Sequence, residues 1–351
     1  MSTQVKVGIA GLGRSGWSIH ANILRNLPDR YQIVAVSDPD IERQREAKGE
    51  FDCNIYSTVD ELLADPAVEL FVVATPSHLH AQHAIQGLKA GKAVVCEKPM
   101  ASTLTEADSM IETAQETRTL LTVFHNRRYA PDFLTVKEVV DSGKLGRILL
   151  IRMAWHKFSR RWDWQTLQAL GGGTLNNTCP HAIDQALQLF GPTEPEIVCH
   201  LERALTLGDA EDHVKIILKP PNAPPSPPSP PLIDIEVSSA CAYPQDPWLV
   251  MGTQGGLSGT FSRLRWRYFS AEELPQRALD TTPTPDRSYN RDEIPWREEE
   301  WSLDQDERPG QTGFYLDLYN TLRHASTLAI TPASARRVMW VIERCHQLCS
   351  G

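Results

Sequence analysis

Three kinds of feature are scarce or missing in this sequence of 351 residues, and two of them exclude a class of protein. No apolar run approaches the roughly 20 residues that a membrane-spanning helix requires. No cluster of Lys and Arg offsets the formal net charge of −9, and nucleic acids are bound through such clusters. We therefore expect neither a membrane protein nor a nucleic-acid-binding protein.

Cysteine is the third scarce feature. The seven cysteines are scattered and odd in number, which is typical of reduced thiols rather than of a disulfide framework. The first residues, MSTQVKVGIAGLG, lack the charged start, long apolar segment and cleavage site of a secretion signal. Both observations favour a cytoplasmic protein. Histidines gather in SHLHAQH, but no carboxylate or cysteine completes a site there, so we expect no metal.

The first third of the chain alternates apolar runs with segments of helical spacing. Continuous apolar strands separated by helices predict a parallel sheet that is covered on both faces. We therefore predict a doubly wound α/β dinucleotide-binding domain over residues 1–122. The apolar runs that support it lie at residues 5–10, 33–36, 70–76, 93–96 and 120–125.

A glycine-rich turn, GLGRSG, joins the first predicted strand to the first predicted helix. In a dinucleotide fingerprint the first glycine (Gly11) permits the tight turn, the second (Gly13) lets the pyrophosphate approach, and the third (Gly16) lets the helix pack on the strand. The start of the helix offers free N–H groups to the phosphates. The predicted cofactor-binding residues of this turn are Gly11, Leu12, Gly13, Arg14, Ser15 and Gly16.

The choice of cofactor depends on Asp38, which ends the second predicted strand. A carboxylate there accepts hydrogen bonds from the ribose hydroxyls and repels a 2′-phosphate, which favours NAD over NADP. Arg43 and Arg45 follow closely and would accommodate a phosphate. NADP therefore stays open as the alternative.

Seven motifs occur in order: GLGRSG, TPSHLH, EKP, NRRYAPDF, GGGTLNNTCPHAID, GTQGGL and FYLDLYNTL. In this combination most of the chain resembles the glucose-fructose oxidoreductase/inositol dehydrogenase family, called Gfo/Idh/MocA. The resemblance implies a second domain at residues 123–351, built on a large, open, mainly antiparallel sheet. It also implies a homodimer or homotetramer formed through the exposed face of that sheet. Strand-like patterns beyond about residue 120 favour the same architecture.

Two further segments have predictions of their own. Thr331 and Pro332 are suited to open a final helix at residues 332–349, which we expect to pack back on the first domain. Proline cannot donate to a sheet ladder, so KPPNAPPSPPSPPLI predicts a surface loop at residues 219–232.

The motif EKP follows a buried strand, and ligands of open parallel sheets bind beyond the carboxyl ends of their strands. Glu97 and Lys98 should therefore face the cofactor cleft. Lys98 would take the proton of a substrate hydroxyl, for which burial must lower its pKa from roughly 10.4. The resemblance implies that Thr75, Pro76 and His80 flank the cofactor.

The motif GGGTLNNTCPHAID supplies the other predicted catalytic groups. The resemblance implies that His181 assists Lys98, together with an aspartate one helical turn earlier. Here that position is Asn177, which can hydrogen-bond a substrate but cannot take its proton. Asp184 is a candidate to orient the His181 ring. The tentative substrate-pocket residues are Arg127, Trp162 and Asp184.

Together these features predict an NAD(P)-dependent oxidoreductase. It would act on a secondary alcohol or ketone of a sugar, polyol or inositol-like molecule. Two alternatives remain: a dinucleotide-binding sensor or regulator without turnover, which Asn177 keeps open, and an NAD-dependent glycosidase acting by transient oxidation.

Overall fold

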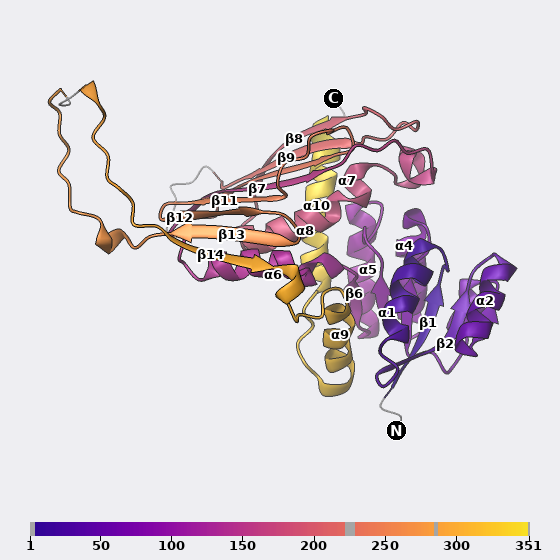
Figure 1. Cartoon of the computed structure of the whole chain (residues 1–351). Coiled ribbons are helices and arrows are strands. Elements are labelled where there is room, and N and C mark those ends of the chain that lie inside the picture. The colour runs from indigo at the N-terminus through magenta and orange to yellow at the C-terminus, as the bar shows by residue number, and fades with distance from the viewer. Residues whose placement is uncertain (1–3, 222–228, 284–286, 350–351) are drawn as a thin grey trace.

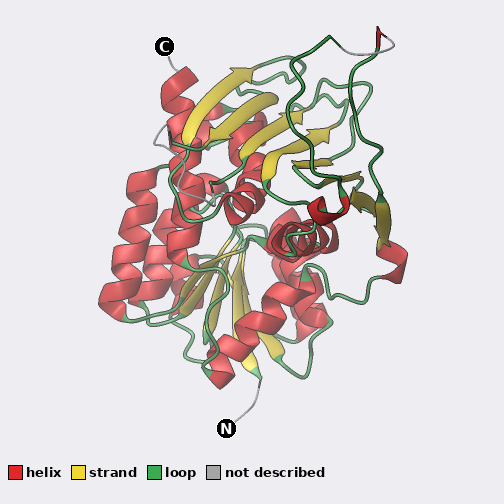
Figure 2. Ribbon diagram, turned by 90° about the vertical axis from the view of Figure 1, so that its left-hand side faces the viewer, coloured by secondary structure: helices red, strands yellow, loops and turns green. Residues whose placement is uncertain are grey.

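The computed structural model describes residues 4–221, 229–283 and 287–349. Within them lie two sheets, a lower one flanked by helices on both sides and an upper one beyond it (Figure 2). Helices lie between the two sheets and contact elements of both halves of the chain (Figure 1). No helix of these residues is both long and apolar enough to cross a membrane.

The first sheet has six parallel strands in the order β3-β2-β1-β4-β5-β6. This order is typical of dinucleotide-binding folds and brings the carboxyl ends of β1 and β4 to the same edge. The predicted doubly wound parallel sheet is confirmed. Its strands are β1 (Val5–Ala10), β2 (Tyr31–Ser37), β3 (Asn54–Tyr56), β4 (Leu70–Val73), β5 (Ala93–Cys96) and β6 (Leu121–Val123).

Helices bury both faces of this sheet, so β4 and β5 are apolar at every position rather than at alternate ones. Phe71 of β4 belongs to a core cluster with α4 and α5, whereas its neighbour Val72 belongs to a second cluster with Phe314 of α9. Capping boxes at Thr58 and Thr103 begin α3 and α5. The helices are η1 (Arg14–Ala21), α1 (Asn22–Arg25), α2 (Ile41–Phe51), α3 (Val59–Leu63), η2 (Ser77–Leu79), α4 (His80–Lys89) and α5 (Leu104–Thr117).

The second sheet has eight strands in the order β14-β13-β12-β11-β7-β10-β9-β8. Only its β7–β10 pair is parallel, so the predicted large, mainly antiparallel sheet is confirmed. Its strands are β7 (Ile148–His156), β8 (Glu196–Glu202), β9 (His213–Lys219), β10 (Leu232–Ser238), β11 (Trp248–Gly252), β12 (Gly255–Gly259), β13 (Arg263–Tyr268) and β14 (Arg297–Ser302).

One face of the second sheet is apolar and covered. Alternate residues such as Met153, Ile216 and Ile235 are buried in the same cluster as residues of α8 and α10. The helices of this half are η3 (Asn126–Tyr129), α6 (Pro131–Asp141), η4 (Trp164–Thr166), η5 (Gln168–Leu170), α7 (Thr174–Asn177), α8 (Cys179–Phe190), η6 (Ala271–Glu273), η8 (Leu303–Gln305), α9 (Thr312–His324) and α10 (Pro332–Cys349).

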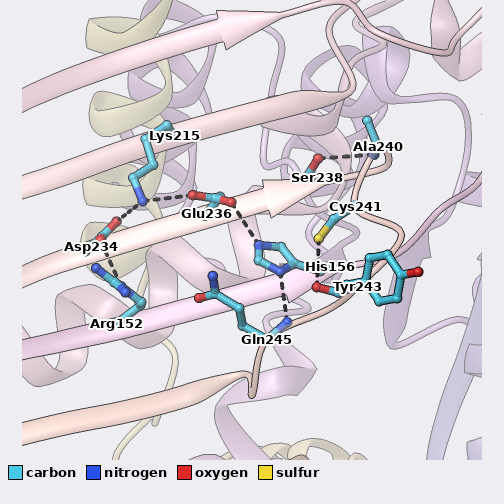
Figure 3. A network of polar contacts seen from close by, with 10 residues as sticks. All are labelled: Arg152, His156, Lys215, Asp234, Glu236, Ser238, Ala240, Cys241, Tyr243 and Gln245. Atoms are coloured by element: carbon cyan, nitrogen blue, oxygen red, sulfur yellow. Dashed lines mark hydrogen bonds and ion pairs between the residues drawn. The ribbon is translucent and has the colours of Figure 1, made fainter.

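The opposite face carries a network of charged side chains across β7, β10 and β9 (Figure 3). Arg152 Nε donates to Asp234 Oδ2 at 3.1 Å, and Lys215 Nζ donates to Glu236 Oε2 at 2.9 Å. His156 Nε2 lies 3.0 Å from Glu236 Oε1. The pleat therefore separates an ionic face from the apolar face that packs on the helices.

Three segments bear on the predicted organisation. The final helix, α10, contacts β8 and α8 of the second half as well as α5 and β6 of the first. The predicted proline-rich loop joins β9 to β10, and its residues 222–228 lie outside the described part. The described residues between β13 and β14 form an arm that extends beyond the sheet (Figure 1). The domain boundary at residue 122 stays a prediction.

Candidate active site

The glycine turn between β1 and η1 leaves no room for side chains at two of its three glycines. Gly11 has φ +86°, and an added Cβ would lie 2.6 Å from the Ala74 carbonyl oxygen. An added Cβ at Gly16 would lie 1.8 Å from the Gly11 carbonyl oxygen. Gly13 is different, because its Cβ would meet no atom within 4 Å. The turn is thus tightly packed on the protein side and open at Gly13, as close approach of a pyrophosphate requires.

The carboxylate of Asp38 is buried and holds this turn in place. Its Oδ2 accepts the Leu12 N–H at 2.7 Å, and its Oδ1 accepts the Asp40 N–H at 2.9 Å. Arg43 Nη1 lies 3.7 Å from Asp38 Oδ2. Asp38 and a cation therefore stand side by side beyond β2, where the ribose of a dinucleotide binds in such folds.

Lys98 lies two residues beyond the end of β5. Its Nζ donates to the backbone oxygen of Asn177 at 2.7 Å and lies 3.3 Å from Asn177 Oδ1. The structure thus brings together two of the predicted catalytic residues, which come from the two halves of the chain. Asn177 Nδ2 in turn donates to Gln165 Oε1 at 3.1 Å.

Glu97 belongs to a buried network that was not predicted from the sequence. Glu97 Oε2 accepts the Lys98 backbone N–H at 2.9 Å, and Oε1 lies 3.2 Å from His20 Nε2. His20 Nδ1 lies 2.7 Å from the hydroxyl of Tyr315 in α9. A signal was available, since His20 follows Gly16 by one helical turn and so shares the face that packs on the sheet.

The electrostatic surroundings of these groups suit proton transfer at Lys98. Burial lowers the pKa of Lys98; Glu97 raises it, and the cations Arg14, Arg161 and Arg127 lower it again. Burial alone would raise the pKa of Glu97, but the hydrogen bond and charge of His20 bring it to about 2. A lysine with a lowered pKa is a better base near neutral pH.

His181 lies in the first turn of α8. Burial and the charge of Lys98 lower the pKa of His181 well below its ordinary value, so the ring is neutral near pH 7. Its Nδ1 is buried and has no hydrogen-bond partner within the part of the chain that the structure describes. A neutral ring with one free nitrogen can orient a substrate hydroxyl.

The His80 ring is buried, with Nδ1 2.7 Å from the Pro99 oxygen and Nε2 2.9 Å from the Thr75 oxygen. Both nitrogens face backbone carbonyls, so His80 joins the end of β4 to the EKP turn. Its position beside a cofactor stays a prediction. Thr75 lies beside the glycine turn: its backbone nitrogen is 3.0 Å from the position that a Cβ added to Gly11 would occupy. Pro76 immediately precedes η2.

The carboxylate of Asp184 is 1% exposed and makes a bidentate contact with Arg128, with Oδ2 3.0 Å from Arg128 Nε. This pairing joins η3 to α8, and no local pattern in the sequence indicates it. A role for Asp184 in orienting His181 or binding substrate stays a prediction.

The other two tentative substrate residues lie in different settings. The guanidinium carbon of Arg127 lies 5.6 Å from the ring centre of Trp155 and 5.9 Å from that of Phe261. Trp162 lies on the loop after β7 and is 75% exposed. Its role in a substrate pocket stays a prediction.

Asn177 also lines a small cleft between α7 and the loop after β7. Its walls are mostly polar and include Lys157, Ser159, Arg161 and Gln165. Among residues 4–221, 229–283 and 287–349, no three His, Cys, Asp or Glu side chains gather as a metal ion requires. The arrangement therefore offers a base, hydrogen-bonding groups and a nucleotide turn.

Two protein-family models match this chain. Residues 5–125 match a family model described as "Oxidoreductase family, NAD-binding Rossmann fold". Residues 133–258 match a model described as "GFO/IDH/MocA C-terminal domain".

Two curated relatives are similar over part of the chain. One is the scyllo-inositol 2-dehydrogenase (NADP(+)) IolW of Bacillus subtilis, 38% identical over 190 residues, which are 53% of this chain and 52% of IolW. The other is the myo-inositol 2-dehydrogenase of Thermotoga maritima, 34% identical over 194 residues, which are 55% of this chain and 57% of that protein. The chain thus matches little more than half the length of these relatives.

A solved structure is similar over nearly the whole fold. The NAD-binding protein from Listeria innocua has a TM-score of 0.80 and 23% identity, with 99% of this chain and 98% of that chain covered. At this identity the likeness concerns the fold alone.

Proposed function

This chain belongs to the Gfo/Idh/MocA family of oxidoreductases, and we propose that it is an NAD(P)-dependent dehydrogenase or reductase. The substrate is a sugar, polyol or inositol-like molecule with a secondary alcohol or the matching ketone. Two curated relatives named as inositol dehydrogenases support this substrate class. One observation supports the proposal above all others. Lys98 follows the carboxyl end of β5, and its Nζ donates to the backbone oxygen of Asn177 at 2.7 Å.

The residues of the first half fit a dinucleotide. The open side of Gly13 and the free N–H groups at the start of η1 would hold its pyrophosphate, and Asp38 its ribose. A bound nicotinamide supplies the hydride acceptor for oxidation or the hydride donor for reduction. NAD is the proposed cofactor because Asp38 would repel a 2′-phosphate. Arg43, 3.7 Å from Asp38, supports NADP as the alternative.

Lys98 transfers the proton of the substrate hydroxyl, and Asn177 and His181 assist it. During oxidation the substrate hydroxyl gives its proton to the neutral amine of Lys98 while its carbon gives up a hydride, which leaves a ketone. The Asn177 backbone oxygen holds the amine in place, and the Asn177 and His181 side chains orient the hydroxyl. In reduction the ammonium of Lys98 returns the proton to the forming alkoxide.

Replacing Lys98 with methionine tests this assignment. Loss of a positioned acid–base group should lower kcat by about 10²–10⁴-fold, followed as nicotinamide absorbance over a panel of sugars, polyols and inositols with NAD and NADP. NADH affinity, measured by fluorescence, should stay within a few-fold of the wild-type value. Lys89→Met, at an exposed position of α4, is the matched control. Full activity in Lys98→Met would remove Lys98 from its role.

A second candidate function rests on Asn177, which cannot take a proton. Under that reading the protein binds the dinucleotide and acts as a sensor or regulator. Tight NADH binding without turnover of any panel member would favour it. We further propose a cytoplasmic homodimer or homotetramer, which sedimentation and fractionation would test.

A further inference from the structure

Two cationic side chains near the proposed site have a carboxylate partner. Arg128 is bidentate to Asp184, and Arg161 Nη2 donates to Asp163 Oδ1 at 2.7 Å. Arg127 differs from both. Within the described residues, no carboxylate lies within ion-pair distance of its guanidinium, and no acceptor receives its side-chain N–H groups.

Arg127 lies beside the helix that carries His181. Its backbone oxygen accepts from Gln185 Nε2 at 2.7 Å, which ties η3 to α8. The charge of its guanidinium also contributes to lowering the pKa of Lys98 and of His181. Both observations support assigning Arg127 to the site that contains Lys98.

Two aromatic rings hold this guanidinium. Its carbon lies 5.6 Å from the ring centre of Trp155 on β7 and 5.9 Å from that of Phe261, which follows β12. Such contacts orient a cation and shield it from water, but they leave all five N–H donors free. Arg127 is thus held in place with its hydrogen-bonding capacity unused.

The indole of Trp155 supplies a donor without an acceptor. Trp155 Nε1 is buried and makes no hydrogen bond to any residue that the structure describes. His181 Nδ1, which donates or accepts according to the tautomer of the ring, likewise has no partner among these residues. An indole N–H can only donate. Buried donors without partners are rare in proteins, so each needs an explanation. The shared explanation is a ligand group rich in acceptor oxygens.

The residue facing Lys98 from the second half adds no negative charge. Lys98 Nζ contacts Asn177, which is neutral. The nearby acid, Glu97, directs its carboxylate to His20 and to the Lys98 backbone. A bound anion would therefore meet two cations, Lys98 and Arg127, without an opposing carboxylate from these residues.

We propose that the substrate is a polyhydroxy acid, whose carboxylate binds Arg127 and the indole N–H of Trp155 while its hydroxyl faces Lys98. This inference rests on the proposed oxidoreductase function and narrows its substrate class. A single planar guanidinium matches a carboxylate through two parallel hydrogen bonds. A phosphate group carries more charge and is commonly bound at helix N-termini, and the start of η1 is assigned to the cofactor.

The test compares each sugar acid with its neutral sugar and with the sugar phosphate. In the wild type, kcat/KM for the acid should exceed that for the neutral sugar by about 10- to 100-fold, mainly through KM, as hydrogen bonds to charged groups contribute. Arg127→Met keeps the chain between the two rings and should bring this ratio near one. Arg127→Lys should retain part of it. Arg265→Met, at an exposed position of β13, is the matched control and should leave the ratio unchanged.

Equal use of neutral and acidic sugars by the wild type would overturn the inference, as would preference for the phosphate or an unchanged ratio in Arg127→Met. Calorimetric titration of the acid into the protein–NADH complex separates this inference from the proposed function. Selective binding of the acid without turnover would support the anion site and refute the oxidoreductase. Turnover of neutral sugars without binding of the acid would support the oxidoreductase function and refute the anion site.

Discussion

Replacing Glu97 with glutamine tests the buried contact between η1 and the turn that carries Lys98. Glu97 is 5% exposed, with His20 Nε2 at 3.2 Å and the Lys98 N–H at 2.9 Å. Burial raises its pKa, but the hydrogen bond and charge of His20, with the charges of Lys98 and His80, lower it from 4.5 to about 2. Since each pKa unit corresponds to about 1.4 kcal/mol, the ionised carboxylate contributes about 3 kcal/mol to the free energy of unfolding at pH 7.

The contribution of Glu97 to the free energy of unfolding depends on pH. Because the folded-state pKa is the lower one, the contribution is complete above pH 4.5 and is lost as the pH falls toward 2. We expect Glu97→Gln to lower the free energy of unfolding by about 3 kcal/mol at pH 7 and by about 2 kcal/mol at pH 3.5. Urea unfolding followed by circular dichroism measures both values.

The matched control is Glu42→Gln, which removes a carboxylate that is 73% exposed and paired with Arg45. A surface pair of this kind contributes about 1 kcal/mol or less. Two results would refute the reasoning: a Glu97 variant as stable as the Glu42 variant at pH 7, or an equal loss of stability at the two pH values. Either would mean that Glu97 is not held ionised by its neighbours.

The remaining predictions concern the glycine turn and the Lys98 contact. Gly16→Ala would place a Cβ 1.8 Å from the Gly11 oxygen, so we expect a loss of about 1–3 kcal/mol in a thermal melt. Gly13→Ala meets no atom within 4 Å, so the protein should stay folded while NADH binds at least about tenfold more weakly by fluorescence titration. Asn177→Asp sets a carboxylate near Lys98 Nζ, now 3.3 Å from Asn177 Oδ1. It should raise the pKa of Lys98 and move the acidic limb of the kcat/KM profile for alcohol oxidation to higher pH.

Each of these predictions can fail separately. Wild-type NADH affinity in Gly13→Ala would mean that no pyrophosphate passes that glycine, and wild-type stability in Gly16→Ala would contradict the packing of the turn. A pH profile that stays in place in Asn177→Asp would show that another group titrates.

Much of the candidate site was predictable because its parts are local. The glycine turn and Asp38 are recognisable from residues close to them in sequence. Lys98 was predicted to face the cofactor cleft because ligands of open parallel sheets bind beyond the carboxyl ends of their strands. His80 shows the limit of such local reasoning, because its partners, the backbone oxygens of Thr75 and Pro99, carry no side-chain signal.

The sequence by itself indicated most strands of the parallel sheet, the glycine turn and the final helix, and therefore the class of fold. These depend on backbone preferences and on apolar spacing over a few residues. Only the tertiary structure decided the pairings: Lys98 with Asn177 across 79 residues, Arg128 with Asp184 across 56, and His20 with Tyr315 across 295. Side chains so far apart in sequence come into contact only when whole helices and strands pack together. A local sequence pattern does not indicate which helices and strands will pack.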